Sequence, residues 1–230
     1  MSTNRIKPSN MDVYRVFLAS PSDVMEERQE VRRFFEEYNR TTANPRGIRF
    51  DVIDWENYST VGVGRAQALI TEQTLGRFKD SLALVIVLMG TRFGRPTGDF
   101  QSGTEEEFAY ALKLNQEQNF PEIKWFLRRV KKLEMSTDDP QQMREALEQW
   151  EKVRAFQKRL NEGDPPIFYK KFEGLEDFRQ IFGQDLRLWL GHPDRPWFDG
   201  RLLPDAHVET MTADVLTNIE HLDSRLLYVA

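Results

Sequence analysis

Leu82-Ala83-Leu84-Val85-Ile86-Val87-Leu88-Met89 is the stretch of sequence that decides the fold. It contains no polar residue, has the length of a strand, and is far shorter than the ~18 apolar residues that a membrane-spanning helix needs. A strand without alternating polar residues is covered on both faces, as the strands of parallel sheets are. The stretch therefore predicts a central strand of a parallel α/β sheet.

Further strand and helix patterns alternate on both sides of this strand. The sequence predicts strands at 13–19, 48–53, 123–127 and 167–169, and helices at 24–38, 65–74, 105–115, 138–161 and 175–190. This alternation favours five parallel strands with right-handed crossovers and helices on both faces. A ligand is then expected at the carboxyl ends of the strands.

The expected helix caps follow from polar residues before three of these helices. Ser22 or Asp23 is predicted to cap the helix at 24–38. Gly103-Thr104 is predicted to cap the helix at 105–115. Asp138 or Asp139 is predicted to cap the long helix that follows.

The remaining segments lie outside the predicted α/β domain at 12–191. Residues 1–11 have no periodicity and are interpreted as a flexible lead. Residues 192–230 are interpreted as a linker followed by an amphipathic helix at 208–227. That helix packs on the domain, mediates self-association or begins a further domain.

Composition excludes several classes of function. The sequence has no cysteine, which excludes a disulfide framework, a thiolate nucleophile and a cysteine zinc site and favours a cytoplasmic protein. The polar start is not a signal peptide, and no membrane partner is expected. The formal net charge of -5 argues against non-specific nucleic-acid binding. No HExxH, Walker A or GxGxxG motif is present, and no metal site is predicted.

The acidic segment Ser102-Gly103-Thr104-Glu105-Glu106-Glu107 is the candidate for catalysis. Its three glutamates begin a helix after the central strand, where α/β folds bind ligands. At about 100° per residue they point in different directions, so one or two of them face a cleft at most. The alternative is surface charge that compensates the helix dipole.

Four other residues are candidates for ligand binding. Ser20 and Ser22 offer hydroxyls to a phosphate or else serve as a helix cap. Arg92, like Arg95 beside it, pairs with a phosphate or forms an exposed ion pair. Trp55 stacks on a base or nicotinamide ring, or fills the core. The basic stretch at 124–132 is interpreted as solvated surface.

An ordered set of segments resembles a TIR-like family found at the amino end of NLR-like NTPases, of the NACHT and related types, including bacterial anti-phage proteins. The segments that carry the resemblance are Val16–Val24 with Glu27-Arg28, Trp55, Gln67 with Ile70, Asp80 with Val85–Gly94 and Pro96-Thr97, and Ser102–Phe108 with Ala111. The run from Gly103 to Ala111 is also similar to the Gly-Thr-x-x-Glu-x-x-x-Ala run of nucleoside deoxyribosyltransferases.

The resemblance implies a flavodoxin-like fold and cleavage of the nicotinamide–ribose bond of NAD⁺. It places the catalytic carboxylate at Glu107, with Glu106 as the second choice, and leaves Glu105 as surface charge. It implies that Ser20, Ser22, Trp55 and Arg92 contact the dinucleotide, which is a substrate; no prosthetic group is expected.

The partners implied are NAD⁺, further copies of the chain through the domain or its C-terminal helix, and a fused or separate NTPase or sensor. Two alternatives stay open. One is a non-catalytic self-association module, and the other is a nucleoside deoxyribosyltransferase-like enzyme.

Overall fold

The computed structural model describes residues 10–54, 75–97, 100–133, 138–163 and 166–197. The chain divides into two compact units, Met1–Asp185 and Leu186–Ala230. The sheet and the residues that line the cavity at its edge belong to the first unit. The predicted helix at 65–74, Trp55 and the predicted helix at 208–227 lie outside the described residues.

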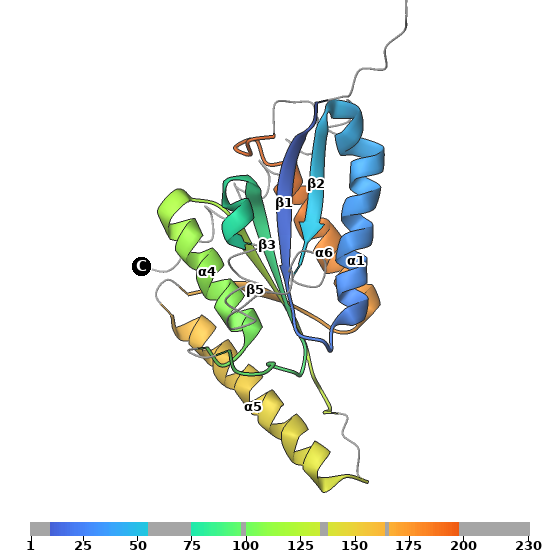
Figure 1. Ribbon diagram of the computed structural model, residues 1–230. Coiled ribbons are helices and arrows are strands. Elements are labelled where there is room, and N and C mark those ends of the chain that lie inside the picture. Colours follow the sequence, from blue (N-terminus) through green and yellow to red (C-terminus); the bar gives the residue numbers. More distant parts are fainter. Residues whose placement is uncertain (1–9, 55–74, 98–99, 134–137, 164–165, 198–230) are drawn as a thin grey trace, which may run out of the picture. The chain divides into compact units, whose positions relative to one another are not determined.

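A parallel five-stranded sheet forms the centre of the first unit (Figure 1). Its strands are β1 (Asp12–Ala19), β2 (Ile48–Ile53), β3 (Leu82–Met89), β4 (Glu122–Arg128) and β5 (Tyr169–Phe172), in the order β2-β1-β3-β4-β5. Every residue of β3 is buried, as its sequence predicts. This order is that of flavodoxin-like folds, so the predicted fold class is confirmed.

Helices cover both faces of the sheet (Figure 1). The helices are α1 (Met25–Tyr38), α4 (Gly103–Gln118), α5 (Pro140–Glu162) and α6 (Leu175–Leu190). On one face Phe182 of α6 lies 5.4 Å from Phe126 of β4, centroid to centroid. On the other face Phe108 of α4 lies 4.9 Å from Trp125, the neighbouring residue of β4, and Phe156 of α5 lies 5.6 Å from the same ring. Adjacent strand residues thus anchor opposite helix layers.

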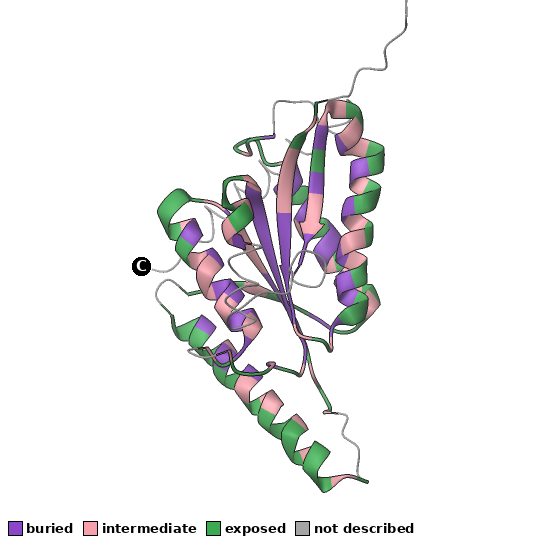
Figure 2. Ribbon diagram, viewed as in Figure 1, coloured by how far each residue is buried: buried purple, intermediate pink, exposed green. Residues whose placement is uncertain are grey.

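The buried positions follow this layering (Figure 2). They lie on the strands and on the helix sides that face them, which is the pattern expected of amphipathic helices. Helix α5 departs from it, because residues 140–152 include no buried position whereas Val153, Phe156 and Leu160 are buried. The C-terminal part of α5, from Trp150 onward, therefore packs against the core.

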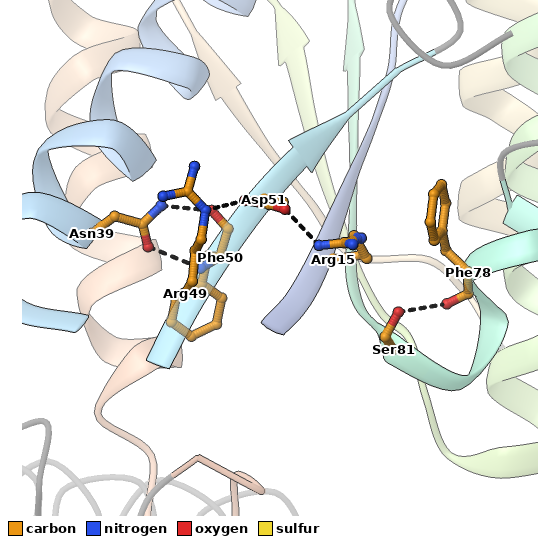
Figure 3. Close-up of polar contacts among 7 residues, drawn as sticks. All are labelled: Arg15, Asn39, Arg49, Phe50, Asp51, Phe78 and Ser81. Carbon is orange, nitrogen blue, oxygen red and sulfur yellow. Dashed lines mark hydrogen bonds and ion pairs between the residues drawn. The ribbon is translucent and has the colours of Figure 1, made fainter. Parts of the chain in front are cut away.

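The outer edge of β2 is closed by a side chain (Figure 3). Asn39, at the start of a single π-helical turn after α1, donates through Nδ2 to the Phe50 carbonyl at 2.6 Å and accepts from the Phe50 amide through Oδ1 at 2.8 Å. These two hydrogen bonds take the place of a neighbouring strand at this edge of the sheet, and Asn39 itself is buried. An ion pair of 2.6 Å between Arg15 and Asp51 joins β1 to β2.

Two predicted helix starts and one predicted strand are corrected. The N-cap of α1 is Val24, without a side-chain hydrogen bond, so neither Ser22 nor Asp23 caps it. Helix α4 begins at Gly103, and Ser102 caps it by accepting from the Glu105 amide. The cap of α5 by Asp139 is confirmed.

The last strand forms at Tyr169–Phe172 rather than at 167–169. Phe168 is 90% exposed, so the apolar triplet that predicted the strand does not lie in the sheet core. The strand instead contains Lys170 and Lys171, both exposed. Charged residues are common on edge strands, and a strand that carries them cannot be recognised by a pattern of apolar residues.

Candidate functional site

The sheet order reverses between β1 and β3, and a cavity of about 900 Å³ lies at the carboxyl ends of these strands. The loop after β1 contributes Ser22, the loop after β3 contributes Arg92 and Arg95, and α5 contributes Glu145 and Gln149. This reversal of strand order between β1 and β3 is a topological switch point, which is where doubly wound folds bind ligands. The volume of the cavity is typical of small-molecule sites.

Asp23 joins the two loops at this switch point. Its Oδ2 accepts from the Thr91 amide at 2.6 Å, the Thr91 hydroxyl at 3.1 Å and the Arg92 amide at 3.1 Å. Gly90 allows this approach, because a Cβ at that position would lie 2.3 Å from the same oxygen. The carboxylate therefore binds a loop 68 residues away along the chain instead of capping α1.

Gln149 of α5 holds the next part of the loop. Its Oε1 accepts from the Phe93 and Gly94 amides, both at 2.9 Å, and its Nε2 donates to the Gly94 carbonyl at 3.1 Å. Gly94 has a φ of +107°, a backbone conformation that residues other than glycine rarely adopt. One amide side chain thus fixes the loop that carries Arg92 and Arg95 against α5.

A partly buried ion pair between α1 and β4 supports the loop after β1. Glu27, only 1% exposed, accepts from Arg128 at 2.6 Å. Arg128 also donates to the Asp23 carbonyl at 3.2 Å. Since Arg128 ends β4, this arginine connects the β1 exit loop to a third strand.

A second group of charges joins the end of β2 to α1. The buried Asp54, which follows β2, pairs with Arg28 and Arg32 of α1.

The three glutamates of the acidic segment have different environments. Glu105 is 8% exposed; its carboxylate accepts from the Gln101 amide at 2.8 Å and from Arg159 of α5 at 2.7 Å. The prediction that Glu105 is surface charge is therefore wrong, because this residue closes the helix start in the manner of a capping box. Glu106 is half-buried, and Glu107 is 3% exposed.

The structure brings together some of the predicted site residues and separates others. Ser22 and Arg92 line the cavity. Ser20 is buried, and its hydroxyl has no hydrogen-bond partner in the described part of the chain. Glu106 and Glu107 are not among the cavity's lining residues, although α4 starts close by: a Cβ on Gly94 would lie 3.2 Å from the Ser102 Cβ. Trp55 lies outside the described residues.

The cavity arginines differ from the basic residues on β4 and after it. Arg92 and Arg95 are exposed, and neither forms an ion pair with any residue that the structure describes. In the stretch at 124–132, by contrast, four cations pair with carboxylates. These are Lys124, Arg128, Arg129 and Lys131. Arg92 and Arg95 thus line the cavity without a described carboxylate to neutralise them, which suits an anionic ligand there.

Two residues that position the site were missed by sequence reasoning. The sequence predicts Asp23 as a candidate helix cap, and it places Gln149 inside the helix at 138–161 with no further role. Neither has a local signal, because their partners are 55 to 69 residues distant.

Within the described ranges, no group of three acidic or histidine side chains is arranged to hold a metal ion. A search of the same residues for a helix long and apolar enough to cross a membrane also finds none.

The sheet order and the cavity at its switch point define a flavodoxin-like α/β protein with a cavity at the carboxyl ends of β1 and β3, the position at which this class of fold binds ligands. Within that class, the chain belongs to the DUF4062 family, described as a domain of unknown function, whose model matches residues 15–187. Comparisons with curated proteins and with solved structures gave no significant match. The family matched is neither a TIR nor a NACHT family, so the TIR-like assignment stays a proposal.

Proposed function

We propose that this chain is a TIR-like effector domain that hydrolyses the nicotinamide–ribose bond of NAD⁺ in bacterial anti-phage immunity and is activated by oligomerisation. The observation that carries the proposal is the switch-point cavity, which presents two arginines beside the start of an acidic helix, neither paired with a carboxylate of the described residues. A dinucleotide needs cations for its diphosphate and a carboxylate for the bond to the ribose.

The cavity supports the binding part of the proposal. Its volume of about 900 Å³ is at the upper end of the range typical for small-molecule sites. The guanidinium groups of Arg92 and Arg95 suit phosphate oxygens, and Ser22 and Thr91 add hydroxyl groups at the same rim.

A carboxylate at the start of α4 supports the chemical part. As the C1′–N bond breaks, its electron pair goes to the nicotinamide nitrogen and cancels the positive charge of the ring. Positive charge develops on the ribose, and a nearby carboxylate stabilises it. Water then bonds to C1′ and releases a proton, which gives ADP-ribose and nicotinamide.

The neighbours of each glutamate distinguish the candidates. Glu105 is held by Arg159 and the Gln101 amide, so it serves the structure of the helix start. The family resemblance favours Glu107, and Glu106 is the second choice. Because Glu107 is 3% exposed and does not line the cavity, the proposal requires that self-association of the chain expose it.

The test is nicotinamide release, followed by chromatography, over a range of protein concentrations and under crowding. Glu107→Gln is expected to lower turnover at least about 100-fold, the usual cost of removing one group that stabilises a transition state. Glu117→Gln is the matched control, since Glu117 lies on the same helix, is exposed and pairs weakly with Lys113 at 3.9 Å.

Each other outcome has a defined meaning. Equal turnover by wild type and Glu107→Gln contradicts the role of Glu107, and loss confined to Glu106→Gln assigns the chemistry to Glu106. No release by the oligomeric wild type contradicts hydrolysis and favours a self-association module. Base exchange on deoxynucleosides without NAD⁺ turnover favours the transferase alternative.

A further inference from the structure

Four consecutive backbone amides of the loop after β3 are occupied by two side chains. The Thr91 and Arg92 amides donate to Asp23 Oδ2, at 2.6 and 3.1 Å. The Phe93 and Gly94 amides donate to Gln149 Oε1, both at 2.9 Å. The hydrogen-bond donors of this loop are thus satisfied by acceptors from two sides, the β1 exit loop and α5.

Loop amides of this kind are the usual anion binders at such a position. Successive N–H groups after a strand form a concave site in which phosphate oxygens accept hydrogen bonds. Here a ligand phosphate would first have to displace the carboxylate of Asp23 or the amide of Gln149. Displacing either leaves a polar group of the protein without its partner, which is costly in a partly buried site.

We propose that a diphosphate-bearing ligand in this cavity is bound by the guanidinium groups of Arg92 and Arg95 rather than by the loop amides, and that Gln149 is a positioning residue for both arginines. The ligand class rests on the proposed function, but the binding mode does not depend on hydrolysis.

The charges around the cavity agree with this binding mode. Arg92 and Arg95 lie on the loop wall, whereas Glu145 and Glu148 lie on the α5 wall. The Glu148 carboxylate pairs with Lys152 at 2.6 Å. Among the described residues, the Glu145 carboxylate accepts from the neutral amide of Gln141 at 3.1 Å and forms no ion pair. An anion is therefore attracted to the loop side of the cavity and repelled by Glu145 on the other.

Gln149 acts through the conformation of the loop. It bonds three backbone groups, at Phe93 N, Gly94 N and Gly94 O, between the two arginines in sequence. Fixing these groups restricts the directions from which Arg92 and Arg95 leave the backbone. A binding site whose groups are fixed before the ligand arrives loses less conformational entropy on binding.

Calorimetric titration of the full chain with inorganic pyrophosphate and with ADP-ribose tests the proposal, because neither probe requires hydrolysis. Arg92→Gln and Arg95→Gln are each expected to weaken binding about tenfold or more, the effect of losing a charge-assisted hydrogen bond. Their affinities should also depend less on salt. Arg154→Gln, an exposed arginine of α5 outside the cavity lining, is the charge control and should bind as wild type does.

Gln149→Met separates the two binding modes by the sign of its effect. The substitution frees the Phe93 and Gly94 amides while it keeps the length of the side chain. If the arginines bind the diphosphate, affinity falls while stoichiometry and the salt dependence stay those of wild type. If the amides bind it, affinity rises. A stoichiometry below that of wild type would reveal misfolding, and Gln149→Leu, which also frees both amides, then repeats the comparison.

The outcomes for binding and for hydrolysis are distinct. Unchanged affinity in both arginine variants, tighter binding by Gln149→Met, or no binding of either probe by wild type overturns this inference. Binding as expected without nicotinamide release overturns only the proposed hydrolysis.

Discussion

Gly90→Ala tests how closely the two loops of the site approach each other. The added methyl carbon would lie 2.3 Å from Asp23 Oδ2 and 3.0 Å from its Cγ, far inside van der Waals contact. Asp23 cannot simply rotate away, because the same oxygen accepts three hydrogen bonds from Thr91 and Arg92. Either the carboxylate is displaced or the β3 exit shifts.

The expected cost follows from these two routes. Overpacking a tight site costs about 1–3 kcal/mol, and losing hydrogen bonds to a charged group costs about 1.5–3 kcal/mol. The two terms do not add fully, since a single movement of Asp23 relieves the contact and breaks the bonds. We expect Gly90→Ala to lower the free energy of unfolding by about 2–4 kcal/mol.

Urea denaturation followed by tryptophan fluorescence measures this cost, and a second background isolates its cause. In Asp23→Ala the carboxylate is absent, so Gly90→Ala should cost less than about 1 kcal/mol there, because the contact to Val24 Cγ1 at 3.1 Å is much less severe. An equal cost of Gly90→Ala in both backgrounds would refute the reasoning, because the clash would then not involve Asp23.

Two further predictions concern the edge of β2 and the charges of α6. Asn39→Ala should lower the free energy of unfolding by about 2–4 kcal/mol in the same denaturation assay, because two buried hydrogen bonds to the strand edge are lost. Asn39→Asp should cost at least as much, because it keeps the acceptor but sets a buried carboxylate oxygen against the Phe50 carbonyl. Burial alone would raise the pKa of Asp185, but hydrogen bonds from Lys124 and Lys170 outweigh it and hold that pKa below 3.8. Asp185 therefore stabilises the fold above pH ~4 and ceases to do so as the pH falls through its folded-state pKa, so the stability difference between wild type and Asp185→Asn should shrink below pH ~4. A difference that is independent of pH would contradict this.

The accuracy of the predicted elements depended on how local their signals are. The strand at 82–89 and the strand at 48–53 have the bounds predicted for them, as does the helix at 175–190, because burial on one or both faces fixes their apolar pattern. The last strand ends at Phe172, three residues beyond its predicted end. It lies at the sheet edge and carries two exposed lysines, so its apolar pattern is misleading. Edge strands need little apolar surface, so their pattern is weak.

The candidate site divides in the same way. Sequence position sufficed to bring Ser22 and Arg92 to the carboxyl ends of the strands, because parallel strands direct their exit loops to one edge. It could not distinguish among the three glutamates, which have the same chemistry and successive positions. Their environments come from Arg159 on another helix and from the way α4 begins.

The sequence by itself determined the central strand, the alternation of strands and helices, and the edge of the sheet at which a ligand site would lie. Hydrophobic burial acts over a few neighbouring residues, so its pattern is visible in the chain. The tertiary structure alone decided that Asp23 and Gln149 hold the loop after Met89, that Asn39 closes the edge of β2, and that the buried Glu105 pairs with an arginine of another helix. These contacts depend on single polar atoms meeting across the fold at hydrogen-bond distance, and no periodicity along the chain encodes such a meeting.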